Sequence, residues 1–200
     1  MRHVRGSNKQ EKNRLMMKAS AKQPLKEKYP PLNISEVAEG MFACRSNACE
    51  LIKESDILST AGHFARAYAL LHTACEELAK FSILELGGRR VFIGNPPIWK
   101  RFWQRFRSHD SKIAQLNVQL ILLMLESGEA ADPDLLKSAE TLFGGGLVIR
   151  NAALYADLGP GESFRSPSDI DFSIPIPILH KISELALAAA DRRGVFGPRC

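Results

Sequence analysis

The stretch that decides the fold is Gly62–Leu86, with the sequence GHFARAYALLHTACEELAKFSILEL. Its apolar residues recur at spacings of three and four, which places them on one face of an α-helix. We therefore predict one long helix with its core face formed by Phe64, Ala67, Tyr68, Leu71, Ala74, Cys75, Leu78 and Phe81. It should end before Gly87-Gly88. Glu76 and Lys80 are four residues apart and predict an ordinary surface ion pair, with a functional role as the alternative.

A second helix is predicted before this stretch. Asn33 followed by Glu36 has the spacing of a capping box, so a helix should begin there and run to about Leu58. One face would carry Val37, Met41, Cys44, Ala48, Leu51 and Ile52. Asn47 falls beside that apolar face, where a polar amide needs a hydrogen-bond partner. It either braces the bundle or reaches a functional site.

A third helix is predicted over Ile98–Glu126, after a loop of turn-forming residues at Gly87–Pro97. Its apolar face would hold Trp99, Phe102, Trp103, Phe106, Ile113, Leu120, Ile121 and Met124. At 3.6 residues per turn, four basic residues fall within about 80° on a separate face: Arg101, Arg105, His109 and Lys112. Asp110 would project toward the apolar side, so it is either paired there or marks a kink at Ser108–Ser111.

The remaining segments also have helical character. Asp132-Pro133 is a typical helix start, and the helix should reach about Phe143. Gly144–Gly146 then favours a hinge over a phosphate loop, because no Lys-Ser/Thr follows it. We expect one or two helical turns within Leu147–Leu158 and a last amphipathic helix over Ile178–Arg192. With no strand alternation, the fold class is all-α, a helical bundle of about five helices.

Charge is distributed unevenly along the chain. Residues 1–28 carry nine Lys and Arg against two Glu, a net charge of +7, while residues 29–200 carry 18 basic against 20 acidic residues. We therefore divide the chain into a disordered basic tail at 1–32, a helical domain at 33–193 and a short tail at 194–200. The basic tail either binds a polyanion such as RNA or is only solvated.

The cysteine pattern and the hydropathy bear on the compartment. The four cysteines form no C-x-x-C pair, and we interpret them as reduced thiols. No apolar run reaches the roughly 18 residues that a membrane span needs, and no signal peptide is recognisable. We expect a cytoplasmic protein without a membrane association. No His/Cys set indicates zinc, so we expect no metal and no cofactor.

Several short motifs together resemble the AbiV group of HEPN-domain proteins over about residues 35–190. They are Asn47-Ala48, Arg66-Ala67, Glu76-Glu77 with Lys80, His109-Asp110 with Lys112, and Arg150-Asn151 with Leu154-Tyr155 and Asp157. The resemblance implies an all-α domain of a bacterial abortive-infection system, which blocks phage multiplication at the expense of the infected cell. Many HEPN proteins are metal-independent RNases that act as homodimers, in which a motif of Arg and His separated by four to six residues meets its copy in one cleft.

The proposed chemistry selects the site residues. Arg150 stands at the position of the motif's Arg, but Tyr155 stands where its histidine is expected. Metal-free RNA cleavage needs a base, an acid and a cation on the phosphate, and His109 could replace the missing histidine as proton carrier. The candidate catalytic residues are Arg150, Tyr155, His109 and Glu77, with Glu76 as an alternative to Glu77. The candidate binding residues are Asn47, Glu76, Lys80, Arg105, Asp110, Lys112, Asn151 and Asp157.

Three functions stay open from the sequence. The first is an abortive-infection effector that holds a phage protein, a nucleotide or RNA in a polar cleft and arrests translation by binding, which the tyrosine at position 155 slightly favours. The second is an active metal-independent ribonuclease toxin. The third is a non-catalytic scaffold, in which the same polar side chains form a buried network that only fixes the bundle.

Overall fold

The computed structural model describes residues 28–127, 137, 146–158, 163–173 and 175–193. The chain divides into two units, Met1–Pro31 and Leu32–Cys200, and the helices and strands named below belong to the second. Most of the predicted tail at 1–32, the tail at 194–200, nearly all of the helix predicted over 132–143 and most of the triple-glycine hinge lie outside the described residues.

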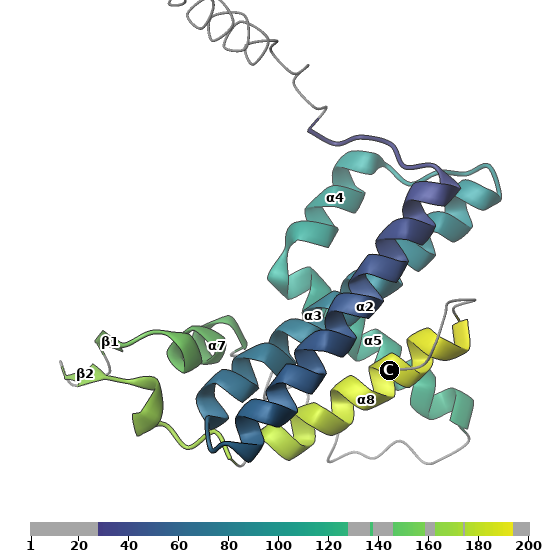
Figure 1. The fold of residues 1–200 in the computed structure, drawn as a ribbon. Helices are drawn as coiled ribbons and strands as arrows, with labels where there is room; N and C mark the ends of the chain where they lie inside the picture. The colour runs from purple at the N-terminus through teal and green to yellow at the C-terminus, as the bar shows by residue number, and fades with distance from the viewer. Residues whose placement is uncertain (1–27, 128–136, 138–145, 159–162, 174, 194–200) are drawn as a thin grey trace, which may run out of the picture. The chain divides into compact units, whose positions relative to one another are not determined.

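The described part of the second unit is almost wholly helical, which confirms the all-α fold class. Figure 1 shows its elements in chain order: α2 (Ile34–Thr60), α3 (Phe64–Phe92), α4 (Trp99–Arg107), α5 (His109–Ser127), α7 (Gly146–Leu154), β1 (Asp157–Leu158), β2 (Phe164–Arg165), the short 3₁₀ helix η1 (Pro167–Asp169) and α8 (Pro175–Arg193). The two strands pair antiparallel and are only two residues long. The last helix begins three residues before its predicted start, on a proline that tolerates the first helical turn.

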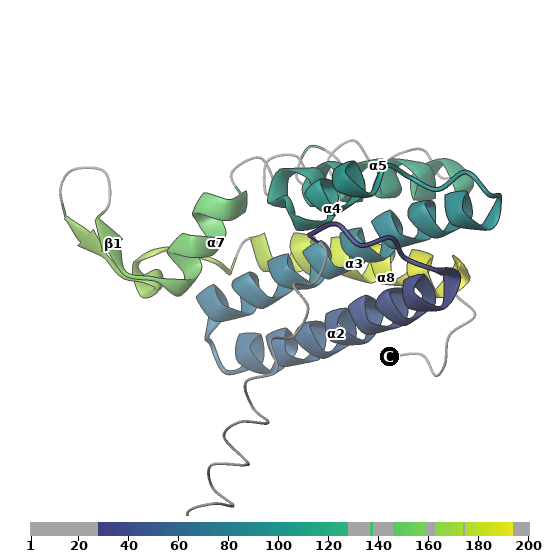
Figure 2. The same ribbon diagram turned by 90° about the horizontal axis from the view of Figure 1, so that it is seen from above.

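Helix α3 is the central element of the bundle. It contacts α2, α4, α5, α7 and α8, and Figure 2 shows it between α2 on one side and α4 and α5 on the other. Its predicted core face is buried apart from Phe64, but burial extends well beyond that face. The largest fully buried apolar side chains are Tyr68, Phe81, Phe172, Leu71, Leu78, Leu116, Leu120, Leu179 and Ile182. Because helices surround α3, three of its polar residues are also buried, namely His72, Glu76 and Ser82.

Helix α2 begins where the sequence predicts. The Glu36 N–H donates to the Asn33 side-chain oxygen at 3.0 Å, and the Asn33 N–H donates to the Glu36 carboxylate at 2.8 Å. This capping box satisfies two N–H groups at the helix start. Farther along, the buried Arg45 binds Asp191 at 2.5 Å and so joins α2 to α8. Gly62, in the turn to α3, has φ of +79°, a value that favours glycine.

The predicted end of the central helix is wrong. Helix α3 does not stop before Gly87-Gly88 but continues to Phe92. A Cβ atom on Gly87 would lie 2.7 Å from a ring carbon of Phe102 in α4, and one on Gly88 would lie 2.8 Å from a methyl group of Val37 in α2. The two glycines therefore allow α4 and α2 to pack closely against two different faces of α3 rather than ending the helix.

The predicted third helix is broken in two. Ser108 has extended backbone angles between α4 and α5, and its hydroxyl accepts from the Ser111 N–H at 3.2 Å, which caps α5. The kink is therefore the correct alternative. Asp110 lies exposed in the first turn of α5, where a negative charge is favourable.

The cysteines only partly follow the prediction. Cys44 and Cys75 are buried free thiols, as expected. Cys49 is also buried but takes part in a disulfide bond, so the expectation of a reduced thiol is wrong at this position. Among the described helices, none combines the length and the apolar character required to cross a membrane. The cytoplasmic location stays a prediction.

Candidate functional site

Three basic side chains from two other helices contact the carboxylate of Glu76, which lies midway along α3. Its Oε1 atom lies 2.7 Å from Nδ1 of His109 and 3.3 Å from Nη1 of Arg150, and its Oε2 atom lies 2.5 Å from Nζ of Lys112. His109 and Lys112 stand on the first turn of α5, and Arg150 stands on α7. We call Glu76, His109, Lys112 and Arg150 the Glu76 cluster.

Glu76 is ionised in this environment. Its residue is 4% exposed, and burial alone would raise the pKa of the carboxyl group. The hydrogen bonds and positive charges of Lys112 and His109 outweigh that burial, so the pKa of Glu76 lies below its ordinary value. A buried carboxylate that keeps its charge binds its basic partners strongly. Glu76 is therefore the anchor of the cluster.

The ionised Glu76 also fixes the orientation of His109. Because the carboxylate can only accept, Nδ1 of His109 is the nitrogen that carries the proton in this contact. Nε2 makes no hydrogen bond with the described residues, and the His109 side chain is 40% exposed. His109 therefore has one ring nitrogen held by Glu76 and the other available to a ligand.

Lys112 and Arg150, the two cations beside His109 in the cluster, differ in exposure and in the closeness of their contacts with Glu76. The Lys112 side chain is 5% exposed and its ammonium group is held at the shortest distance, whereas the Arg150 side chain is 18% exposed and has one long contact. Nε of Arg150 is buried and has no hydrogen-bond partner among the described residues. With Glu76 as the single anion of the cluster, the positive charge is in excess. The cluster can attract a further anion, and Arg150 has donors left to bind it.

His72 is a neighbour of the cluster that the sequence interpretation missed. It lies one turn before Glu76 on α3, with Nδ1 at 3.6 Å from Oε1 of that carboxylate. Burial lowers its pKa to about 4, and the positive charges of Arg150, His109 and Lys112 add to this effect against the attraction of Glu76. His72 is therefore neutral at pH 7. The available signal was its spacing of four from both Tyr68 and Glu76 on the core helix.

One comparison with known proteins identifies the chain. The family model of AbiV, a HEPN domain, matches residues 36–172, a range that includes the whole Glu76 cluster. The chain belongs to the AbiV family. No curated protein and no solved structure matches it significantly. Family membership confirms the resemblance expected from the motifs and makes the chain an abortive-infection HEPN protein.

Two of the AbiV-like motif residues on α3 lie apart from the cluster. Lys80 donates to Glu77 at 2.6 Å, so the ion pair predicted between Glu76 and Lys80 is wrong. Glu77 also hydrogen-bonds the Cys44 thiol on α2, whose pKa is raised to about 12 chiefly by burial and next by the Glu77 charge. Glu76 and Glu77 are adjacent in sequence but face different neighbouring helices. The structure therefore places Glu76, not Glu77, with His109 and Arg150.

Other AbiV-like motif residues are exposed and do not join the Glu76 cluster. Tyr155 follows the end of α7 and is 64% exposed. Asn47, Asp110, Asn151 and Asp157 are also exposed, and Asp157 accepts from the N–H of the next residue. Arg105 donates to Gln115 of α5 at 3.0 Å. The structure thus brings together four of the twelve predicted site residues, and the functions of all twelve stay predictions.

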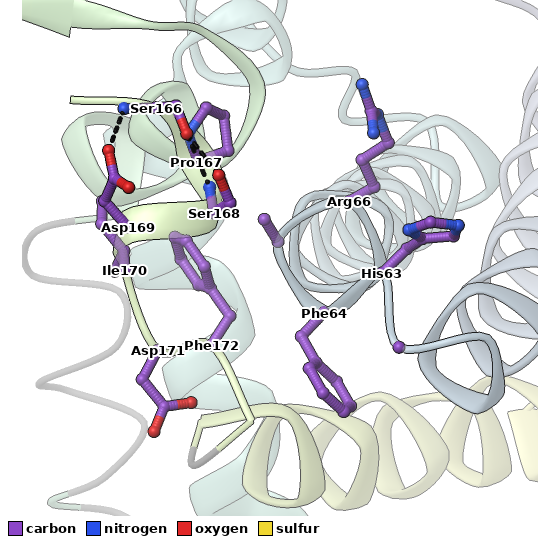
Figure 3. Close-up of a pocket in the computed structure, with 12 residues that line it drawn as sticks. His63, Phe64, Arg66, Ser166, Pro167, Ser168, Asp169, Ile170, Asp171 and Phe172 are labelled. Atoms are coloured by element: carbon purple, nitrogen blue, oxygen red, sulfur yellow. Dashed lines mark hydrogen bonds between the residues drawn. The ribbon is translucent and has the colours of Figure 1, made fainter. Parts of the chain in front are cut away.

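A separate pocket of about 660 Å³ lies where α3 begins, between Gly62–Arg66 and Ser166–Phe172. Figure 3 shows His63 and Arg66 pointing away from Ser166 and Asp169 across this space. Its basic groups do not converge, in contrast to those of the Glu76 cluster. Within the described residues, no group of three His, Cys, Asp or Glu side chains could hold a metal ion. The Glu76 cluster is the better candidate site of this AbiV-family chain.

Proposed function

We propose that the protein is an abortive-infection effector that blocks phage multiplication by acting on RNA through the Glu76 cluster. The observation that carries this proposal is the convergence of Lys112, Arg150 and His109 on one buried carboxylate. This arrangement leaves excess positive charge beside a half-exposed histidine. RNA is a polyanion, and its phosphates are attracted to such a site.

Each group has a distinct part in this proposal. Lys112 is buried and fully engaged with Glu76, so it positions the carboxylate and supplies charge at short range. Arg150 is less buried and its Nε is unpaired among the described residues, so its planar guanidinium can turn donors toward a phosphate. Nε2 of His109 is then available to the RNA whose phosphate Arg150 binds.

RNA cleavage is the second candidate function, and the contact between His109 and Glu76 favours it. A carboxylate on Nδ1 keeps the proton on that nitrogen and leaves Nε2 as a base for the ribose 2′-hydroxyl. Arg150 would stabilise the negative charge that develops on the phosphorus centre. His109 would then perform the role that the family motif gives to the histidine absent at position 155.

A homodimer is part of the same proposal. The family resemblance implies two copies of the chain that act together. Large apolar side chains are exposed where α3 ends, with Phe92 79% and Ile93 70% exposed, and such a surface is typical of an interaction site.

Phage challenge of cells that express single variants tests the proposal. Arg150→Ala and His109→Ala should abolish phage resistance while the purified proteins keep their circular dichroism spectra and melting temperatures within a few degrees. Arg165→Ala and His63→Ala are matched controls, because both positions are exposed and lie outside the cluster. They should retain full resistance. Total RNA from infected cells, examined for new cuts, separates cleavage from binding.

Three outcomes would change the conclusion. Uncut RNA together with lost resistance in Arg150→Ala would leave RNA binding and reject cleavage. A large fall in melting temperature, with resistance lost only in proportion, would show that the cluster is a structural network. Full resistance in both cluster variants would reject the proposed function.

A further inference from the structure

A pocket between the end of α3 and α4 is lined by three arginines. Arg90 comes from the last turns of α3, and Arg101 and Arg105 come from α4. The pocket has a volume of about 240 Å³, and its apolar lining residues include Phe102 and Ile98. No acidic residue lines it. We call it the arginine pocket.

The arginines of this pocket are not neutralised by ion pairs within the described residues. Arg90 donates to the backbone and side-chain oxygens of Asn95, and Arg105 donates to the amide oxygen of Gln115, so both bind neutral groups. Arg101 is exposed and makes no hydrogen bond or ion pair with the described residues. Three guanidinium groups around one small hollow repel one another unless an anion binds between them.

The arginine pocket is joined to the Glu76 cluster through α5. Gln115, the partner of Arg105, lies one helical turn beyond Lys112, a rise of about 4.5 Å along the axis. The short break at Ser108 is what folds α4 back so that Arg105 reaches α5. Arg105 of the pocket and Lys112 of the cluster are therefore linked to neighbouring turns of the same helix.

We propose that the arginine pocket binds a phosphate of the RNA backbone and so positions one strand on the Glu76 cluster. This inference rests on the proposed function and extends the site by one binding position. Arginine suits this task, because its planar donors match two phosphate oxygens at once. The side chains of Arg101, Arg105 and Arg90 provide the positioning contacts, and His109 and Arg150 contact the strand beyond them.

The size and lining of the pocket favour a backbone phosphate over other anions. At about 240 Å³ it is smaller than the roughly 300 to 1,000 Å³ of pockets that enclose a whole small-molecule ligand. The aromatic Phe102 is buried in the core, 6% exposed, so it offers no surface on which a base could stack. Binding should therefore depend on the backbone and little on base sequence.

The test is binding of a fluorescein-labelled single-stranded oligouridylate to the full chain, measured by fluorescence anisotropy at several salt concentrations. Arg101→Gln should weaken binding about tenfold and lower the slope of log affinity against log salt by about 0.7 to 1. Lys100→Gln is the matched control, since the neighbouring residue on α4 is exposed and does not line the pocket. It should change the affinity less than about threefold. Arg101→Lys should fall between the two.

Separate readouts distinguish failure of this inference from failure of the proposed function. If Arg101→Gln and Lys100→Gln bind RNA equally while Arg150→Ala binds weakly, the arginine pocket is not an RNA contact but the cluster is. If Arg101→Gln weakens binding while Arg150→Ala and His109→Ala keep full phage resistance, the pocket binds RNA and the proposed role of the cluster is wrong. If Arg101→Gln loses phage resistance with unchanged RNA affinity, the pocket binds an acidic protein, which overturns the inference.

Discussion

At the scale of single residues, the environment of Glu76 determines what its neighbours can do. The same carboxylate keeps its charge, directs Nδ1 of His109 toward itself and holds Lys112 out of solvent. His72, unlike Glu76, is uncharged, because its burial and the nearby cations disfavour its protonated form. Two histidines within reach of one carboxylate thus have different roles, one available to a ligand and one neutral in the core.

The buried His72 gives the protein an acid-dependent stability. Its pKa is lowered from 6.5 to about 4 on folding, so between these values the unfolded chain binds a proton that the folded chain does not. Stability should be complete above about pH 6.5 and fall by roughly 3 kcal/mol as the pH falls to 4. The free energy of unfolding, measured with guanidinium chloride over this range, should decline in the wild type and change less in His72→Gln.

The matched control for His72 is His63→Gln, at the exposed start of the same helix. It should keep the pH dependence of the wild type. Equal slopes in His72→Gln and the wild type would mean that other groups cause the acid sensitivity. Below pH 4.5 a further loss is expected in the wild type, because the depressed pKa of Glu76 stabilises the folded state only while that group is ionised.

At the scale of elements, the sequence predicted features that depend on residues close together in one segment. It did not predict features that depend on contacts between helices. The capping box of Asn33 and Glu36 involves residues three apart, so the sequence suffices to place the start of α2. The pair Gly87-Gly88 has the composition of a helix end, but it continues α3 because neighbouring helices approach it closely. The residue pattern of one segment does not tell which side chains of another segment pack against it.

The close approach at Gly87 makes a specific substitution costly. Gly87→Ala would gain about 1 kcal/mol in helix propensity, but its Cβ atom would lie 2.7 Å from the ring of Phe102. Overpacking of this kind costs about 1 to 3 kcal/mol, so we expect a net loss of stability in chemical denaturation. Phe102→Leu should cost less in the Gly87→Ala background than in the wild type, which a double-mutant cycle measures.

Gly40→Ala serves as the comparison for Gly87→Ala. Its Cβ atom would meet a terminal methyl of Leu84 at 3.1 Å, a flexible contact that can move aside. It should be tolerated better than Gly87→Ala. If both substitutions stabilise the protein, the glycines are not required for helix packing and the continuation of α3 needs another explanation.

The site was only partly predictable for the same reason. Glu76, His109, Lys112 and Arg150 could all be named from the sequence, because their residue types suit phosphate chemistry and match the family motifs. Which of Glu76 and Glu77 faces α5 depends on how α3 sits among its neighbours, which periodicity in α3 alone does not determine. The role of Gln115 as partner of Arg105 depended on the break at Ser108, and that break was only one of two alternatives.

At the scale of the whole molecule, we propose that the apolar surface at the end of α3 is where two copies meet. A groove of about 450 Å³ lies there between α2 and α3, with Ile34, Met41, Phe92 and Ile93 among its lining residues. Static light scattering at micromolar concentration should give the mass of a dimer. Phe92→Ser should shift the protein toward the monomer, because it removes apolar area from the interface.

Phe164→Ser is a suitable control for this prediction, since Phe164 is 82% exposed on β2 and outside the groove. It should leave the mass unchanged. A monomeric wild type would reject the dimer, whereas a dimer unaffected by Phe92→Ser would place the interface on another surface.

The contacts of α3 with α2, α4, α5, α7 and α8 have a consequence for hydrogen exchange, which reports slow motions. Because α7 packs mainly against α3 alone, we expect its amide protons to exchange with solvent through local opening. The middle of α3 has no such route, because it is covered on several sides at once. Its amides should exchange only when the whole bundle unfolds. Glu76 therefore lies in the segment whose backbone amides we expect to exchange most slowly. Its partner Arg150 lies on α7, whose amides we expect to exchange faster, through local opening.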